Sequence, residues 1–441
     1  MEAKGLSDSG DANVRREISP VRRGWVLALL TAIWTLSYTD RSVFGVVIQP
    51  IKKEFVLSDT MMGLMTGFGF TLIYLILSLP VSRYADRKSR VPLLTVGLVV
   101  WSAMTALGGV ARSAWQVLVY RMGVGVGEST SLSPAMSLIG DYFPKEKRAM
   151  ATSIFGIAPN LGLALGIMVG GFMAHYYGWR SAFYVAGIPG LIVAAIFYLT
   201  VKEPTRGLAD GRLADTTDYN LGDTSRYLAK NKTFLILMWG QAMFSLSGIS
   251  FGIWNVPFLI RVHHLNMIQI GGWLGAVSLL GVPGALLGGV VTTFVSKQND
   301  KWKIIVPGLA LLLMAPALFA YLFTSSMPLL WTSLLVLIIL MGMPTPLLAA
   351  LIPTVAKVRM RALGTALYFM AGNLFGWGLG PLFIGMMNDA FGPTFGQLAI
   401  RYSMLITVAA ALAGGLGTIW GARYVEGDIK TAAARVEAAT A

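Results

Sequence analysis

Four side chains that can carry a charge lie inside stretches that are otherwise apolar enough to cross a lipid bilayer: Asp40, Arg41, Arg121 and Glu128. A charge at membrane depth is costly unless it is paired or hydrated, so such groups usually serve a function. Arg121 and Glu128 are two helical turns apart, and both therefore project from one face of a helix, about 10 Å apart along its axis. The helix with Asp40 and Arg41 is expected to run the opposite way and to bring all four groups into one cluster.

Such a cluster can take up and release protons. Burial, a neighbouring guanidinium and contact with water act on the proton affinity of a carboxyl group in different directions, so a change of conformation can change its protonation. We therefore expect Asp40 and Glu128 to be the protonation sites. Arg41 and Arg121 are expected to be their switching partners or anchors for an anionic headgroup. The alternative is a static network of buried ion pairs that fixes helix register.

The helices that must position these groups can be counted from the apolar runs. The chain has 441 residues, of which 55% are hydrophobic and 13% charged, a composition typical of integral membrane proteins. A span needs about 20 apolar residues, whereas the strands of a membrane barrel are about half as long and alternate in polarity. We predict an all-α protein with twelve transmembrane helices, at residues 24–48, 61–81, 91–110, 114–139, 150–174, 182–201, 233–259, 270–295, 304–323, 329–352, 362–387 and 398–419.

A long polar interval divides these spans six and six. The interval also contains the segment 224–232, which is either a short interfacial helix or part of a disordered linker. The halves resemble each other at an offset of 213 residues, where Arg148 matches Arg361 and Asn160 matches Asn373. We predict two pseudo-symmetric six-helix bundles and the following order: an N-terminal tail at 1–23, a bundle at 24–201, a linker at 202–232, a bundle at 233–423 and a C-terminal tail at 424–441.

The basic residues are sorted by loop. The formal net charge is +14, and 27 of the 35 Lys and Arg residues fall in the tails and in loops on the same side as the tails. This bias predicts that both termini are cytoplasmic in a multi-pass protein of the cell (inner or plasma) membrane, and it excludes nucleic acid as the reason for the charge. The first 23 residues lack a cleavable signal pattern, so the first span is expected to direct insertion.

Several motifs resemble those of the major facilitator superfamily. The segment 82–90 (SRYADRKSR) is similar to its G-x-L-A-D-R-x-G-R signature, 121–128 (RMGVGVGE) to its span-four pattern, and 201–207 (VKEPTRG) to the end of its sixth span. Within that superfamily the chain resembles the Spinster group, including its bacterial members, through the segments 39–41, 125–129, 141–144 and 373–381. The anion:cation symporter group, which also has an Asp-Arg pair in span one, is the closest alternative.

The resemblance implies a transporter that alternates between inward-open and outward-open states and moves sphingosine phosphate, lysolipids or related amphiphiles. It also implies a cytoplasmic gate in which Asp86, Arg90, Asp141 and Arg148 bridge to the end of span four or to the facing half. Each exposed pair in such a gate is worth only about 0–1 kcal/mol, but several together can bias the states.

The second half has no acidic side chain in its predicted spans. It offers Trp254, Asn255, Tyr368 and Asn373 as candidates for a substrate cavity, alongside Trp377, and few polar groups on an apolar surface suit an amphiphile. We expect a monomer that binds a small amphipathic or lipid-like substrate, with the proton as coupling ion, no other cofactor and no metal. No motif indicates an enzyme. A symporter of small organic anions and a passive facilitator of amphipathic drugs are the alternatives.

Overall fold

Helices make up most of the described chain. The computed structural model describes residues 19–205, 221–297, 299–356 and 360–440, and within these ranges it contains no strand. The first half contains ten helical elements: α1 (Pro20–Phe55), α2 (Asp59–Gly63), η1 (Leu64–Phe68), α3 (Gly69–Arg87), α4 (Arg90–Gly108), α5 (Ala114–Glu128), α6 (Leu132–Tyr142), α7 (Lys145–Phe155), α8 (Ala158–Tyr176) and α9 (Trp179–Thr200).

The second half repeats this plan after a short linker helix, α10 (Leu221–Ala229). Its elements are α11 (Lys232–His263), α12 (Met267–Ser278), α13 (Gly281–Val295), α14 (Trp302–Phe323), α15 (Met327–Met341), α16 (Pro344–Ala349), α17 (Ile352–Val355), α18 (Arg361–Gly372), η3 (Asn373–Leu379), α19 (Gly380–Phe395), η4 (Gly396–Leu398), α20 (Ala399–Ser403) and α21 (Leu405–Thr440).

The predicted fold class, an all-α membrane protein with twelve spans, is confirmed. Nine helical stretches among the described residues are long and apolar enough to cross a membrane, and one of them, Leu363–Val425, runs through the turn at Gly396 and covers two crossings. The two crossings that carry the ionisable groups, α1 and the pair α5–α6, complete the twelve.

The first and last helices of the chain extend beyond their predicted boundaries. Helix α1 begins at Pro20, before the predicted residue 24, because the Ser19 side chain accepts a hydrogen bond from the backbone N–H of Arg22 at 3.3 Å and Pro20 suits the first turn. Helix α21 continues to Thr440 through the predicted C-terminal tail. Helix α10 occupies part of the predicted linker, and residues 206–220 lie outside the description.

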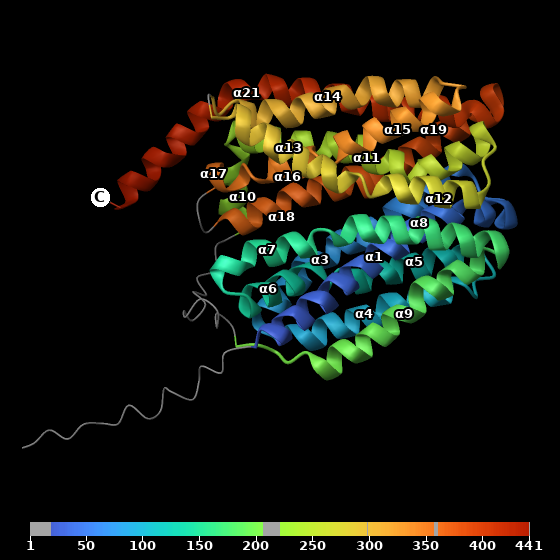
Figure 1. Cartoon of the computed structure of the whole chain (residues 1–441), viewed down its shortest axis with the longest axis horizontal. Helices are drawn as coiled ribbons and strands as arrows, with labels where there is room; N and C mark the ends of the chain where they lie inside the picture. The colour runs from blue at the N-terminus through green and yellow to red at the C-terminus, as the bar shows by residue number, and fades with distance from the viewer. Residues whose placement is uncertain (1–18, 206–220, 298, 357–359, 441) are drawn as a thin grey trace, which may run out of the picture.

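The two halves lie side by side, and their helices run along the long axis of the molecule (Figure 1). We call the end where α1 begins and α10 lies the linker end, and the opposite end the far end. The contacts between halves join α2 to α19 and α8 to α12 towards the far end, and η1 to η3 near the middle. Linker-end helices such as α7 and α18 make no comparable contact across the halves within the described chain. The halves are therefore joined at the far end.

Two π-helical segments meet at the interface between the halves. A Cβ atom at Gly67 in η1 would lie 3.0 Å from the carbonyl oxygen of Gly378 in η3, so glycine permits this close approach. π-helical turns occur frequently at functional sites. Segment η3 carries Trp377, which this contact holds beside the first half.

The helix that carries Arg121 and Glu128 also departs from a simple span. Helix α5 ends at Glu128, and a turn through Ser129–Ser131 separates it from α6. A Cβ atom at Gly127 would lie only 2.6 Å from the backbone nitrogen of Trp101, so glycine lets α5 pack closely against α4. The turn and the close packing together place Glu128 in the interior of the first half, where it is fully buried.

Candidate functional site

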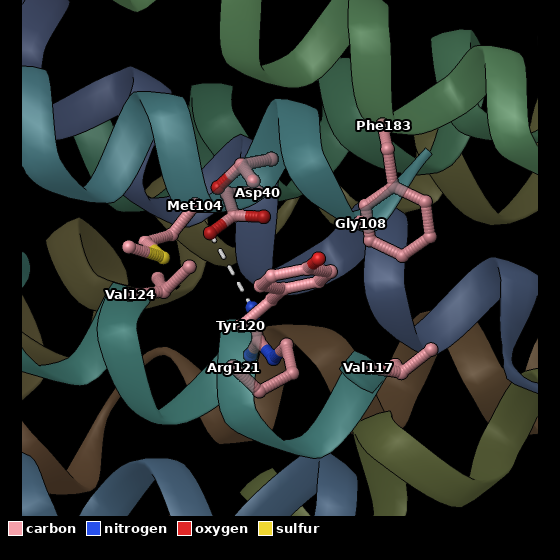
Figure 2. A pocket seen from close by; sticks show the side chains of 9 residues that line it. Asp40, Met104, Gly108, Val117, Tyr120, Arg121, Val124 and Phe183 are labelled. Carbon is pink, nitrogen blue, oxygen red and sulfur yellow. Dashed lines mark hydrogen bonds and ion pairs between the residues drawn. The ribbon is translucent and has the colours of Figure 1, made fainter. Parts of the chain in front are cut away.

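The four ionisable residues predicted from the sequence form two ion pairs between α1 and α5. Arg41 donates to Oε2 of Glu128 from Nε at 2.9 Å and from Nη2 at 2.5 Å, and the Ser37 hydroxyl donates to the same oxygen at 2.8 Å. Arg121 Nη1 lies 3.3 Å from Oδ2 of Asp40, as the dashed line in Figure 2 shows. Neighbours in α1 thus pair with residues two turns apart in α5.

The cluster is buried and has equal numbers of positive and negative groups. The exposed fractions are 2% for Asp40, 7% for Arg41, 3% for Arg121 and 0% for Glu128. One oxygen of each carboxyl group is bound by an arginine, whereas Oδ1 of Asp40 and Oε1 of Glu128 have no hydrogen-bond partner. Such spare atoms are unusual in a static buried network, because an unsatisfied buried polar group costs about 1–3 kcal/mol.

Aromatic rings surround the Arg41 guanidinium. Its central carbon lies 4.7–5.7 Å from the ring centroids of Tyr38, Phe70, Tyr74 and Trp377. Three of these rings belong to the first half, and Trp377 belongs to η3 of the second half. Ring faces attract cations, so Arg41 connects the charged cluster to the facing half.

A cavity of about 240 Å³ lies between the halves next to this residue. Its polar lining includes Arg41 and Ser42 of α1, Asn160 of α8 and Asn255 of α11, and most other lining residues are apolar. The Asn255 side-chain oxygen is held by the Tyr321 hydroxyl at 2.5 Å. The arrangement offers one cation at the edge of a largely apolar space.

Only one of the four predicted cavity residues, Asn255, lines this cavity. Trp254 is fully buried and donates to the Pro381 carbonyl at 3.0 Å, so it packs α11 against α19. Tyr368 donates to the Thr345 carbonyl at 3.0 Å inside a separate core, and Asn373 is half-buried at the start of η3. The direction in which each of these side chains points depends on helix packing, which the sequence does not specify. Trp377, which the sequence offered alongside these four, lines the cavity as well, and so does Asn160, which was not predicted.

The predicted gate residues lie at the linker end and bind within the first half. Arg90 is 1% exposed, forms an ion pair with Asp141, and donates to Ser137 at 2.8 Å. Sequence reasoning missed its other partner, Glu203, at 2.7 Å, although Glu203 lies in the motif at the end of the sixth span. The partners of Arg90 therefore come from its own half. Of the two expected bridges, the described residues show the one to the end of span four, through Asp141, and none from Arg90 to the facing half. Arg148 donates to the carbonyls of Gly140 and Phe143, and the side chain of Asp86 lies outside the description.

A second polar cluster, at the far end, joins the halves and was not predicted. Asp59 accepts from Arg261 of α11 at 2.5 and 2.8 Å and pairs with Lys52 of α1. Asp389 of α19 accepts from the backbone N–H groups of Asp59 and Thr60 at 2.9 and 2.8 Å and from the Thr60 hydroxyl at 2.6 Å. In the sequence, Lys52 and Arg261 lie just outside predicted spans, and nothing there shows that residues 59, 261 and 389 meet.

Comparison with known proteins agrees with this architecture. Residues 30–381 match the sequence model of the Major Facilitator Superfamily. The chain is 29% identical to an MFS-type efflux pump of Mycolicibacterium smegmatis, over 91% of this chain and 94% of that protein. It is 25% identical to the sphingosine-1-phosphate transporter SPNS2 of Danio rerio, over 91% of this chain and 84% of that protein.

A solved structure is also similar over nearly the whole chain. It is a bacterial homologue of the human lysosomal transporter Spinster in an inward-facing and unoccupied conformation, with 28% identity and a TM-score of 0.83. The comparison covers 93% of this chain and 99% of the solved one. Both the predicted superfamily and the likeness to Spinster are thereby confirmed.

Proposed function

This chain belongs to the Major Facilitator Superfamily, whose fold serves transporters rather than enzymes, and from that premise we propose that it couples proton movement to transport of a lipid-like amphiphile. The proposed cargo has an anionic headgroup and one or more apolar tails. Transport proceeds by alternating access of the cavity between the halves. The proposal is carried by one observation: a buried cluster of two acids and two bases with a spare oxygen on each acid, beside a largely apolar cavity.

Charge balance gives the coupling step. The cluster is neutral as it stands, and an uncompensated charge at this depth is costly. When an anionic headgroup binds Arg41 from the cavity, Glu128 loses its partner, and a proton on Glu128 restores neutrality. When the headgroup leaves, Arg41 returns to Glu128 and the proton departs. The spare Oε1 atom is where this proton binds.

The cavity supports an amphiphile as cargo. Arg41 provides the charge-assisted hydrogen bonds that a phosphate or similar headgroup requires. Residues such as Val46, Ile167 and Leu334 provide the apolar surface for a tail. The similarity to a sphingosine-1-phosphate transporter is consistent with this substrate class.

The loop charges and the far-end contacts support an orientation. We place the linker end and both termini in the cytoplasm, in a cell membrane, because the basic residues concentrate there. The halves are joined at the far end, so this structure corresponds to the inward-facing state. In this scheme Arg90 holds the linker ends of α4, α6 and α9 together as one rigid body, and a monomer suffices for transport.

Flux measurements in proteoliposomes test the proposal. With a pH gradient imposed, uptake of a fluorescent lysolipid should fall at least about 100-fold in Glu128→Gln and in Asp40→Asn. Glu54→Gln is the matched control. Glu54 is a carboxylate on α1, the helix of Asp40, and it pairs with Arg180 at the far end. It should retain normal flux. Full pH-driven uptake by both Glu128→Gln and Asp40→Asn would refute the proton-coupling role.

Competition tests the substrate class. Unlabelled lysolipids and sphingoid phosphates should inhibit uptake of the fluorescent lysolipid, and Arg41→Met should no longer bind these compounds. Inhibition by small carboxylates alone would replace the amphiphile with a small organic anion. Flux through the unmodified protein that does not depend on the pH gradient would indicate a passive facilitator.

A further inference from the structure

A small cavity adjoins Asp40 and shares no lining residue with the cavity between the halves. It measures about 10 Å³, close to the space that one water molecule needs. Figure 2 shows it between the Asp40 carboxyl group of α1, the Tyr120 and Arg121 side chains of α5, Met104 of α4 and Phe183 of α9. All of these residues belong to the first half.

Two buried polar atoms of opposite character belong to residues that line this cavity. Oδ1 of Asp40 is an acceptor without a donor, and Nε of Arg121 is a donor without an acceptor. The Thr105 hydroxyl, which also lines the cavity, donates to the Trp101 carbonyl at 2.9 Å and so can only accept a further hydrogen bond. One water molecule would accept from Arg121 and donate to both Asp40 and Thr105. Three hydrogen bonds are typical of a buried water.

We propose that this cavity binds a single water molecule that bridges Arg121 and Asp40 and carries protons to and from the Asp40 carboxyl group. This inference rests on the proposed function, in which Glu128 binds the coupled proton, and it takes Asp40 as the second protonation site expected from the sequence. The cavity lies near the far-end termini of α4 and α5, since Gly108 ends α4 and Val117 is in the first turn of α5. Tyr120, which lines the cavity and is half-buried, supplies the next hydroxyl group along the route. The proton route is therefore separate from the substrate cavity.

Few charged or titratable groups lie near Asp40. Arg41 is on its own helix, and Arg121, Glu128 and Tyr120 face it from α5. The cavity residues from α4 and α9, which are Met104, Thr105, Gly108 and Phe183, carry no charge. A change confined to the cavity therefore tests the water site without altering the charges around Asp40.

Filling the cavity tests the proposal. Val124→Ile adds one methylene group at its wall, and Val119→Ile makes the same change on an exposed position of the same helix as a control. In infrared difference spectra, the carbonyl band of protonated Asp40 is identified by its loss in Asp40→Asn. This band should move to higher wavenumber in Val124→Ile, because a hydrogen bond is lost, and should stay in place in Val119→Ile. pH-driven uptake should slow about tenfold in Val124→Ile only.

A second variant covers the case in which Val124→Ile does not fold. Thr105→Val removes one partner of the water at nearly constant volume and should shift the same band in the same direction by a smaller amount. If Asp40→Asn abolishes coupling while Val124→Ile and Thr105→Val leave band and rate unchanged, the water site is wrong and the proposed function stands. If Asp40→Asn transports normally, the proposed function itself fails at this residue.

Discussion

The buried cluster in the first half and the polar cluster at the far end both combine carboxylates with basic side chains but differ in their hydrogen bonding. In the buried cluster, Asp40 and Glu128 each keep one oxygen without a partner. At the far end, both oxygens of Asp59 and both oxygens of Asp389 are bound. The first cluster lies within one half, whereas the second joins the two. Incomplete hydrogen bonding suits groups that exchange protons, and complete bonding suits a contact that holds a conformation.

The largest expected effect comes from breaking an ion pair in the buried cluster. Glu128→Ala leaves the Arg41 charge buried without its partner, which should lower the free energy of unfolding by about 3–5 kcal/mol. Thermal unfolding in detergent, followed by tryptophan fluorescence, measures this loss. The double variant Glu128→Leu with Arg41→Met removes both charges and should recover most of the stability. A double variant as unstable as the single one would contradict the account.

Breaking the far-end cluster should change conformation more than stability. Arg261→Ala removes the link from α11 to Asp59 and should shift the balance of states away from far-end closure by about 1–3 kcal/mol. The chain has no cysteine, so spin labels at Lys53→Cys and Thr394→Cys report the distance between the halves directly.

Arg180→Ala provides the matched control for that measurement. It breaks a pair with Glu54 at 2.6 Å that lies at the same end but within the first half. The label distance should lengthen in Arg261→Ala and remain unchanged in Arg180→Ala. Equal distances in all three proteins would show that Asp59 and Arg261 do not hold the halves together.

The Arg90 cluster should show an intermediate effect on stability alone. Arg90→Lys retains the charge but cannot reach Ser137, Glu203 and the Pro204 carbonyl together, so we expect a loss of about 1–3 kcal/mol. Arg83→Lys, at an exposed position of α3, should cost nothing measurable. Unchanged thermal stability in Arg90→Lys would show that the ion pair with Asp141 alone provides the stability of this cluster.

The smallest effect is expected at Glu54, which lies beyond the first predicted span and is well exposed. Hydrogen bonds from Arg180 and Trp179 lower the pKa of its carboxyl group below the usual value. The pair therefore contributes fully above the pKa of unfolded Glu54, and this contribution is lost as the pH falls through the lower folded pKa. A surface pair is worth at most about 1 kcal/mol. The free energies of unfolding of Glu54→Gln and of the unmodified protein should converge at low pH. A difference that stays constant with pH would contradict the assignment.

The sequence by itself determined the class of protein, the twelve crossings, the two halves and the four buried ionisable residues. Each depends on a local or periodic signal: apolar runs of fixed length, a repeat at constant offset, or a charge inside an apolar run. Spacing along α5 also fixed the two-turn separation of Arg121 and Glu128. These features do not depend on how the side chains pack, because only helices and closed barrels can span a bilayer.

Tertiary structure alone decided which groups pair and where side chains point. Arg41 binds Glu128 rather than its neighbour Asp40, Trp254 and Tyr368 turn into helix packing rather than the cavity, and Glu203 joins Arg90. The far-end contact of Asp59 with Arg261 spans 202 residues of sequence. A few degrees of helix rotation would redirect each of these side chains, and rotation is set by contacts from several helices at once. No signal local to one segment carries that information.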